Sequence, residues 1–209
     1  MMRKKFERVL IDIDTQRDFI DPDGALFFEG AEKTIPNLEK LFAWAADRGV
    51  PIISTVDSHD PDDPEFADWP PHCVLDTWGH EKLPETLIEP RKVVRREGET
   101  LDVDSLFERY RQVIFQKQTI GLFDNPALQQ VISELDVDCY IVCGVATDYC
   151  VRSMVEKLLE MDRCVELVVD AIEGIDKQTS GDLVKTFISQ GVAPMTTAAL
   201  VARQEAGET

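Results

Sequence analysis

The segment 138–150, DCYIVCGVATDYC, constrains the fold of this chain more than any other. An apolar run at 140–145 predicts a buried strand, and the small and polar residues that follow it predict a tight turn. Apolar residues then recur at helical spacing, which predicts a helix over 148–161. A strand, a turn and a helix in this order form the repeating unit of α/β proteins.

This turn would place the thiol of Cys150 in the first turn of the helix. Unpaired backbone N–H groups and the positive end of the helix dipole would lower the pKa of the thiol and could stabilise an oxyanion beside it. The alternative is an inert core residue, as most cysteines are. Cys139, Cys143 and Cys164 lie in apolar runs and are predicted to be core residues, and Cys73 is ambiguous.

Predicted strands and helices alternate along the whole chain. Strands are predicted at 9–13, 50–56, 113–116, 140–145, 164–169 and 193–195, with a short edge strand allowed at 93–94. Helices are predicted at 31–48, 102–111, 125–135, 148–161, 177–190 and 197–204, and the Pro-, Asp- and His-rich segment 57–90 predicts a functional loop. We expect one domain over residues 1–209, a three-layer α/β/α sandwich with a mostly parallel sheet of about six strands.

Composition excludes several classes of partner. The formal net charge of −18 argues against nucleic acid, because phosphate contacts require clustered Lys and Arg. The sequence has neither an apolar run long enough to cross a bilayer nor the apolar core of a secretory signal, so no membrane partner is expected. Five cysteines, an odd number, favour a reducing compartment over a disulfide framework. We therefore expect a cytoplasmic protein.

Chemically useful side chains follow several of the predicted strands. Asp14 follows the first strand, Lys117 follows the strand at 113–116, and Cys150 follows the turn described above. Ligands of parallel sheets bind beyond the carboxyl ends of the strands, so these three side chains should converge. A carboxylate can take the proton of a thiol, and a lysine beside both favours their charged forms. Taken singly, Asp14 could cap a turn and Lys117 could be solvated.

A second group of side chains has the composition of a metal site. Asp57, His59, Glu65 and His72 lie in the long loop 57–90 or at its start. Imidazole with carboxylate suits zinc, iron or manganese. The alternative is a polar, solvated loop, because further aspartates lie in the same segment. His80 lies outside the group and is predicted to be a surface residue.

Together these residues resemble the isochorismatase-like cysteine hydrolases, and within that superfamily the nicotinamidases. The matching blocks are DTQRDF at 14–19, DSH at 57–59 with Glu65, WPPHC at 69–73 and GVATDYCV at 144–151. The block around Cys150 is shared across the superfamily, whereas the metal block with WPPHC points to the nicotinamidases. Lys117 falls after a strand, where the family has its catalytic lysine.

The resemblance implies an α/β/α hydrolase that converts nicotinamide to nicotinic acid and ammonia through a thioester on Cys150. In that scheme Asp14 is the acid and base, and Lys117 holds the charged forms of Asp14 and Cys150. The backbone N–H groups of Ala146 and Cys150 form the oxyanion hole, and the peptide bond before Ala146 is cis.

The resemblance also implies the ligands of the site. Phe19, Trp69 and Val145 would contact a small carboxamide substrate. Asp57, His59, Glu65 and His72 would hold a divalent metal, zinc in the first place, with iron or manganese as alternatives. Family members often self-associate, so a homo-oligomer is allowed. The loop 117–125 differs from the longer nicotinamidase loop, which leaves the exact amide open.

Three other functions are alternatives to nicotinamide hydrolysis. A related cysteine hydrolase acting on a carbamoyl, ureido or enol-ether substrate would share the chemistry of Cys150 and would lack the full metal block. A noncatalytic binding protein on the same fold would be expected to lack part of the triad. A redox protein is disfavoured because the sequence has no CxxC motif.

Overall fold

The computed structural model describes residues 5–121 and 124–205, so residues 1–4, 122–123 and 206–209 lie outside the description that follows. One parallel sheet has the strand order β3-β4-β2-β1-β5-β6-β7. The strands are β1 (Lys5–Ile13), β2 (Ile52–Asp57), β3 (Arg91–Val94), β4 (Gln112–Lys117), β5 (Asp136–Val145), β6 (Val165–Glu173) and β7 (Ala193–Met195).

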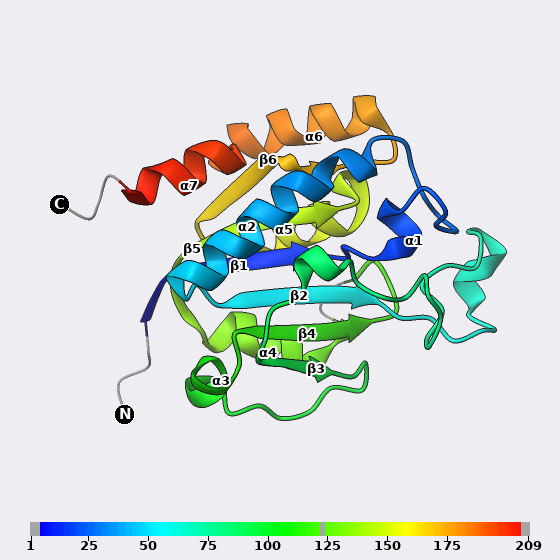
Figure 1. The fold of residues 1–209 in the computed structure, drawn as a ribbon, viewed down its shortest axis with the longest axis horizontal. Coiled ribbons are helices and arrows are strands. Elements are labelled where there is room, and N and C mark those ends of the chain that lie inside the picture. Colours follow the sequence, from blue (N-terminus) through cyan, green and yellow to red (C-terminus); the bar gives the residue numbers. More distant parts are fainter. Residues whose placement is uncertain (1–4, 122–123, 206–209) are drawn as a thin grey trace.

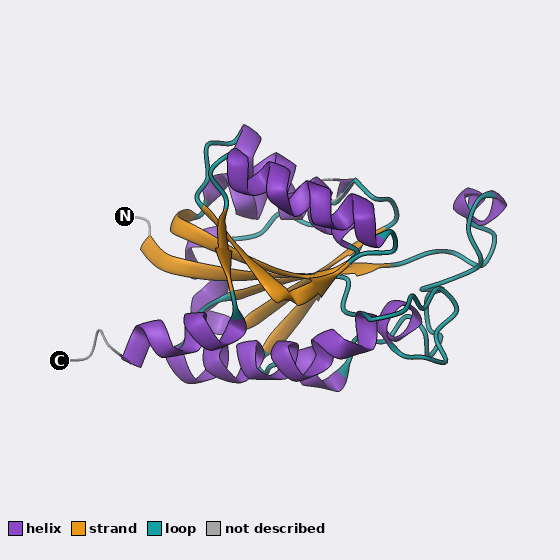
Figure 2. Cartoon of the chain, turned by 90° about the horizontal axis from the view of Figure 1, so that it is seen from above, coloured by secondary structure: helices purple, strands orange, loops and turns teal. Residues whose placement is uncertain are grey.

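The α-helices of the described residues connect these strands and cover both faces of the sheet (Figures 1 and 2). They are α1 (Arg17–Ile20), α2 (Ile35–Arg48), α3 (Val103–Arg109), α4 (Pro126–Glu134), α5 (Arg152–Glu160), α6 (Lys177–Ser189) and α7 (Thr197–Glu205). Short 3-10 turns lie at Ala31–Thr34, Pro64–Ala67 and Pro84–Thr86. None of the helices in the described part of the chain is both long enough and apolar enough to span a membrane.

The predicted three-layer α/β/α class is confirmed, with one correction to the strand count. The sheet has seven strands rather than about six, because Arg91–Val94 pairs with β4 as an edge strand. An edge strand needs hydrogen bonds along one side only and tolerates charged side chains, so its sequence lacks the apolar signal of the inner strands.

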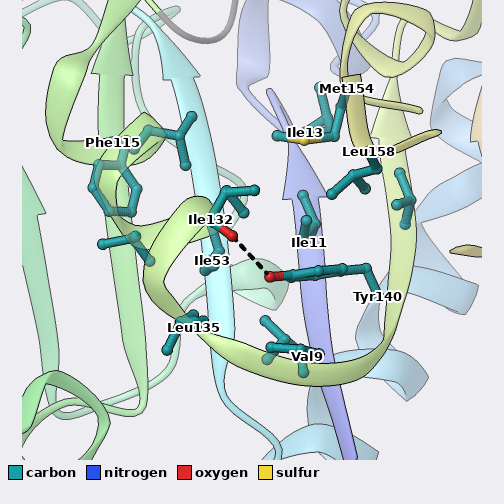
Figure 3. Close-up of a cluster of buried hydrophobic side chains, with 14 of the residues drawn as sticks. Val9, Ile11, Ile13, Ile53, Phe115, Ile132, Leu135, Tyr140, Met154 and Leu158 are labelled. Atoms are coloured by element: carbon teal, nitrogen blue, oxygen red, sulfur yellow. Dashed lines mark hydrogen bonds between the residues drawn. The ribbon is translucent and has the colours of Figure 1, made fainter. Parts of the chain in front are cut away.

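The strands are apolar because helices cover both of their faces. Successive residues of β1 alternate between two cores: Val9 and Ile11 pack on the side of α4 and α5, whereas Leu10 packs on the side of α2 and α7. Figure 3 shows the first core, where the Tyr140 hydroxyl donates to the carbonyl oxygen of Ile132. Both faces of the central strands are therefore buried against helices.

The second core contains a buried ion pair that the sequence pattern did not predict. Asp12 of β1 is fully buried, and the Lys82 ammonium lies 2.6 Å from its carboxylate. Lys82 also donates to the Thr15 hydroxyl at 2.7 Å, and that hydroxyl donates to Asp12. A buried carboxylate without a cation would be costly, so Asp12 requires Lys82 beside it. This pairing holds the 82–86 segment against the end of β1.

Two cysteines depart from the prediction of a reduced core. Cys139 and Cys164 form a disulfide, and Cys164 is exposed rather than buried. The register explains the pairing, because β5 and β6 align Tyr140 with Val165 and so bring the preceding residues to a Cα–Cα distance of 4.6 Å. The other cysteines, Cys73, Cys143 and Cys150, are free and buried.

The strand order places a topological switch beside β1. The chain runs from β1 to β2 on one side, and β5 later pairs with the other side of β1. Figure 1 shows the carboxyl ends of these strands on the right, where the long connection after β2 projects. Ligands of parallel sheets bind at such a point, so the candidate site is expected there.

Gly144 allows β5 to approach β1 closely at this point. Its φ is +110°, and a Cβ atom there would lie 2.1 Å from the carbonyl oxygen of Ile13. We expect Gly144→Ala to lower the free energy of unfolding by about 2–5 kcal/mol, through backbone strain and overpacking. Urea denaturation would measure this loss.

Gly181→Ala is the matched control. Gly181 lies in α6 with open space around its Cα, so alanine there should raise stability by up to about 1 kcal/mol. Equal effects of the two substitutions would contradict the close approach of β5 to β1.

Candidate active site and metal centre

The predicted convergence of Asp14, Lys117 and Cys150 is present at the switch point. The Lys117 ammonium lies 2.9 Å from Asp14 Oδ2 and 3.5 Å from Cys150 Sγ. It also lies 3.1 Å from Asp57 Oδ1, so one cation joins residues at or just beyond the carboxyl ends of β1, β2 and β5. Asp14, Lys117 and Cys150 are all buried.

Asp14 adopts an uncommon backbone conformation that its neighbours fix. Its φ is +47°, in the left-handed region that few residues other than glycine adopt. The Thr55 hydroxyl donates to Asp14 Oδ1 at 2.7 Å, and the backbone N–H of Asp14 points at the Thr55 carbonyl oxygen at 3.3 Å. The carboxylate is therefore held at the end of β1 and turned toward Lys117.

Gln16 joins the ends of β1 and β2 in the same way as a strand partner would. Its side-chain oxygen accepts from the backbone N–H of Asp57 at 2.7 Å, and its amide nitrogen donates to the Asp57 carbonyl oxygen at 2.8 Å. The same nitrogen donates to the His80 carbonyl oxygen at 2.9 Å. Gln16 lies in the block at 14–19, but nothing in the local sequence predicts this pairing with Asp57.

Burial and ion pairing have opposite effects on the pKa values of Asp14, Asp57 and Lys117. Burial raises the pKa of the Asp14 carboxyl, even though Lys117 opposes the shift. Burial would also raise the pKa of Asp57, but Lys117 and the two histidines reverse that effect and hold it below its usual range. Burial lowers the pKa of Lys117, but Asp14 and Asp57 outweigh it and raise the pKa well above its ordinary value.

The prediction that the pKa of the Cys150 thiol is low is wrong. Burial, with Asp14 and Asp57 nearby, raises the pKa of this thiol well above its usual value, and Lys117 lowers it only in part. The local backbone also differs from the predicted first turn of an α-helix, because Cys150 lies in a π-helical turn, Thr147–Val151, that precedes α5. The thiol therefore needs a base beside it to lose its proton, and Asp14 is the carboxylate placed there.

Asp57, His59 and His72 form a compact set of metal-type donors. One ligand atom from each lies within 4.8 Å of the others, and all three residues are buried. Asp57 Oδ2 lies 3.1 Å from His59 Nε2 and 3.5 Å from His72 Nε2. His72 Nδ1 donates to the Pro70 carbonyl oxygen at 2.8 Å, which leaves Nε2 facing the carboxylate. This donor set fits a divalent metal of the zinc, iron or manganese type.

Asp57 and Asp63 together raise the pKa of His59 to about 9, against the opposing effect of burial. A metal at this position would therefore replace a proton on His59. Glu65 does not belong to the compact set, although it lines the pocket beside it. His80 is half-buried rather than a surface residue, because its Nε2 and the Ser58 hydroxyl share a hydrogen bond of 2.8 Å.

A mostly apolar pocket opens between these two groups. It includes the predicted residues Phe19, Trp69 and Val145 together with Asp14, Ala146 and Cys150. Four further wall residues were not predicted from the sequence, namely Leu26, Ile120, Tyr149 and Ile175. Tyr149 packs edge-on against Trp69 with a centroid separation of 5.6 Å. Aromatic and aliphatic side chains therefore form most of the wall beside the Cys150 sulfur.

Two carboxylates hold the walls of this pocket. Asp18 accepts from the backbone N–H groups of Cys73 and Ala25, at 2.6 and 2.9 Å, and so ties the WPPHC segment to the segment carrying Leu26. Asp148 accepts from Ile175 N–H at 3.0 Å. The peptide bond between Val145 and Ala146 is cis, as expected. Of the loop 117–125, Leu122 and Phe123 lie outside the described residues.

Comparison with known proteins agrees with this geometry. The sequence model of the isochorismatase domain family matches residues 8–199, nearly the whole chain. The chain belongs to the isochorismatase family.

This family member is similar to two curated enzymes of known activity. It is 26% identical to the nicotinamidase of Escherichia coli over 90% of this chain and 93% of that protein. It is 29% identical to the nicotinamidase/pyrazinamidase of Mycobacterium tuberculosis, over 83% of this chain and 90% of that one. Its fold is similar to the crystal structure of the pyrazinamidase of Pyrococcus horikoshii in complex with zinc. That pair has a TM-score of 0.73 and 26% identity, over 91% of this chain and 99% of the other.

The buried position of Lys117 leads to a stability prediction. Lys117→Met leaves two buried carboxylates without their cation, so we expect a loss of about 3–5 kcal/mol in the free energy of unfolding. Urea denaturation of the metal-free protein would measure it. Lys185→Met is the control, because Lys185 and its partner Asp182 are exposed and such pairs contribute little. A similar small loss for both variants would refute the role of Lys117 as the compensating charge.

Proposed function

We propose that this protein is a cysteine-dependent amidohydrolase that converts nicotinamide to nicotinic acid and ammonia. The observation that carries the proposal is that Cys150, Asp14, Asp57 and His72 line one mostly apolar pocket. Lys117 joins Asp14, Asp57 and Cys150 beneath it, and His59 completes the metal-type donors. A nucleophile in an apolar pocket next to a cluster of metal donors suits a heteroaromatic carboxamide. Similarity to nicotinamidases supports the same substrate.

The proposed reaction begins with proton transfer from Cys150 to Asp14. Burial raises the pKa of Asp14, which makes it a stronger base than a solvated carboxylate, and Lys117 stabilises whichever group is negative. The thiolate then attacks the amide carbon, and a carbon–sulfur bond forms as the carbonyl electrons move to oxygen. The backbone N–H groups of Ala146 and Cys150 are proposed to stabilise this oxyanion, a contribution of about 3–4 kcal/mol for one donor.

Collapse of the intermediate would break the carbon–nitrogen bond. Asp14 returns its proton to the leaving nitrogen, which departs as ammonia and leaves a thioester on Cys150. Asp14 then removes a proton from water, the resulting hydroxide attacks the thioester, and the Cys150 sulfur leaves with the proton from Asp14. The products are the carboxylic acid and free enzyme.

Asp57, His59 and His72 are the residues that would hold the metal, with Glu65 as a further ligand from the pocket wall. When bound, the metal would supply a Lewis acid for the ring nitrogen of the substrate. Phe19 and Trp69 would contact the faces of the ring, and Val145 would contact its edge.

The proposal is tested by ammonia release from nicotinamide, with metal content determined on the same sample. We expect turnover with bound metal in the wild type, and bound metal without turnover in Cys150→Ala. Full activity in Cys150→Ala would refute the thioester mechanism. Release of ammonia from carbamoyl substrates alone, with no bound metal, would favour the related cysteine hydrolases instead.

The metal cluster leads to a separate prediction about binding. His72→Ala removes one donor and leaves Cys150, Asp14 and Lys117 in place, so we expect loss of metal and a KM for nicotinamide that rises more than kcat falls. Steady-state kinetics with metal analysis would check this. A variant that kept its metal, or that lost kcat alone, would contradict a role of the cluster in substrate binding.

A further inference from the structure

The imidazole of His59 is fixed by a carboxylate on the side opposite Asp57. His59 Nδ1 lies 3.0 Å from Asp63 Oδ2, and both residues are buried. Because an ionised carboxylate only accepts hydrogen bonds, Nδ1 carries the proton. The Nε2 atom of the same ring then faces Asp57 Oδ2 at 3.1 Å. Asp63 therefore sets both the tautomer and the orientation of the ring.

The second oxygen of Asp63 holds the segment that carries Glu65. Asp63 is the N-cap of the 3-10 turn Pro64–Ala67, and its Oδ1 accepts from the backbone N–H of Glu65 at 2.9 Å. One side chain thus fixes the ring of His59 and the backbone of Glu65 at the same time. This double role distinguishes Asp63 from its neighbour Asp62, which is exposed.

Gln118 ties Asp63 to the strand that carries Lys117. The Gln118 side-chain amide donates to Asp63 Oδ2 at 2.5 Å, and Gln118 follows directly after the last residue of β4. Gln118 therefore adds a second connection between the donor cluster and β4, beside the direct contact of Lys117 with Asp57. Gln118 lies in the 117–125 segment, where this sequence departs from the nicotinamidase pattern.

We propose that Asp63 and Gln118 are positioning residues for the metal site, and that Asp63 acts through His59. A histidine ligand binds metal more tightly when a carboxylate accepts the proton of its other ring nitrogen, because the ring is oriented and made more basic. The inference rests on the proposed function, since it requires a metal held by Asp57, His59 and His72. It adds residues that do not themselves reach the metal.

The test compares zinc affinity across three variants of the full chain. Metal-free protein is titrated with Zn²⁺ in competition with a chromophoric chelator, and thermal unfolding of each metal-free variant is recorded. Asp63→Asn keeps a side-chain oxygen for the cap but loses the charge opposite His59, so affinity should fall about 10- to 100-fold. Gln118→Leu should weaken affinity less, and the control Asp62→Asn should leave it unchanged.

Asp63→Ser separates the two roles of the carboxylate. Serine is a good N-cap but is too short to reach His59, so this variant should keep the turn that carries Glu65 and still bind zinc weakly. Wild-type affinity in Asp63→Asn and Asp63→Ser would overturn the inference and leave the proposed function intact. Absence of zinc binding by the wild type would overturn the proposed metal site and the inference together.

Discussion

A single buried cation holds this site together. The Lys117 ammonium contacts Asp14, Asp57 and Cys150, which lie at or just beyond the carboxyl ends of three different strands. Without it, two carboxylates and a thiol would lie close together in a buried place, and their negative charges could not coexist. The sheet supplies the geometry, because parallel neighbours end at the same edge. The positive charge of Lys117 offsets the repulsion between the carboxylates that this geometry brings together.

The fold and the convergence of Asp14, Lys117 and Cys150 were predictable for the same physical reason. Strands buried on both faces are mostly apolar, so Asp14 and Lys117 stand out as charged residues at the carboxyl ends of such strands. The turn before Cys150 is equally distinct in the sequence. Their convergence then follows from the rule that parallel strands end at one edge, and needs no knowledge of side-chain contacts.

The supporting contacts could not be predicted, because each depends on partners far apart in the chain. Lys82 lies seventy residues from Asp12, and nothing local distinguishes it from a solvated lysine. The Cys139–Cys164 bond depends on the register between β5 and β6. Asp63 lies among other aspartates of the same loop, and only the position of His59 singles it out. The elevated pKa of Cys150 reflects burial, which the helix position alone does not reveal.

The arrangement of the five cysteines has a consequence for chemical labelling. Cys139 and Cys164 are bonded to each other, and Cys73 and Cys143 are fully enclosed by the second core. Cys150 alone among them lines the pocket. An electrophile shaped like a flat heteroaromatic ring would thus meet one sulfur in the folded molecule. Such a reagent could count intact sites in a mixed sample without any measurement of turnover.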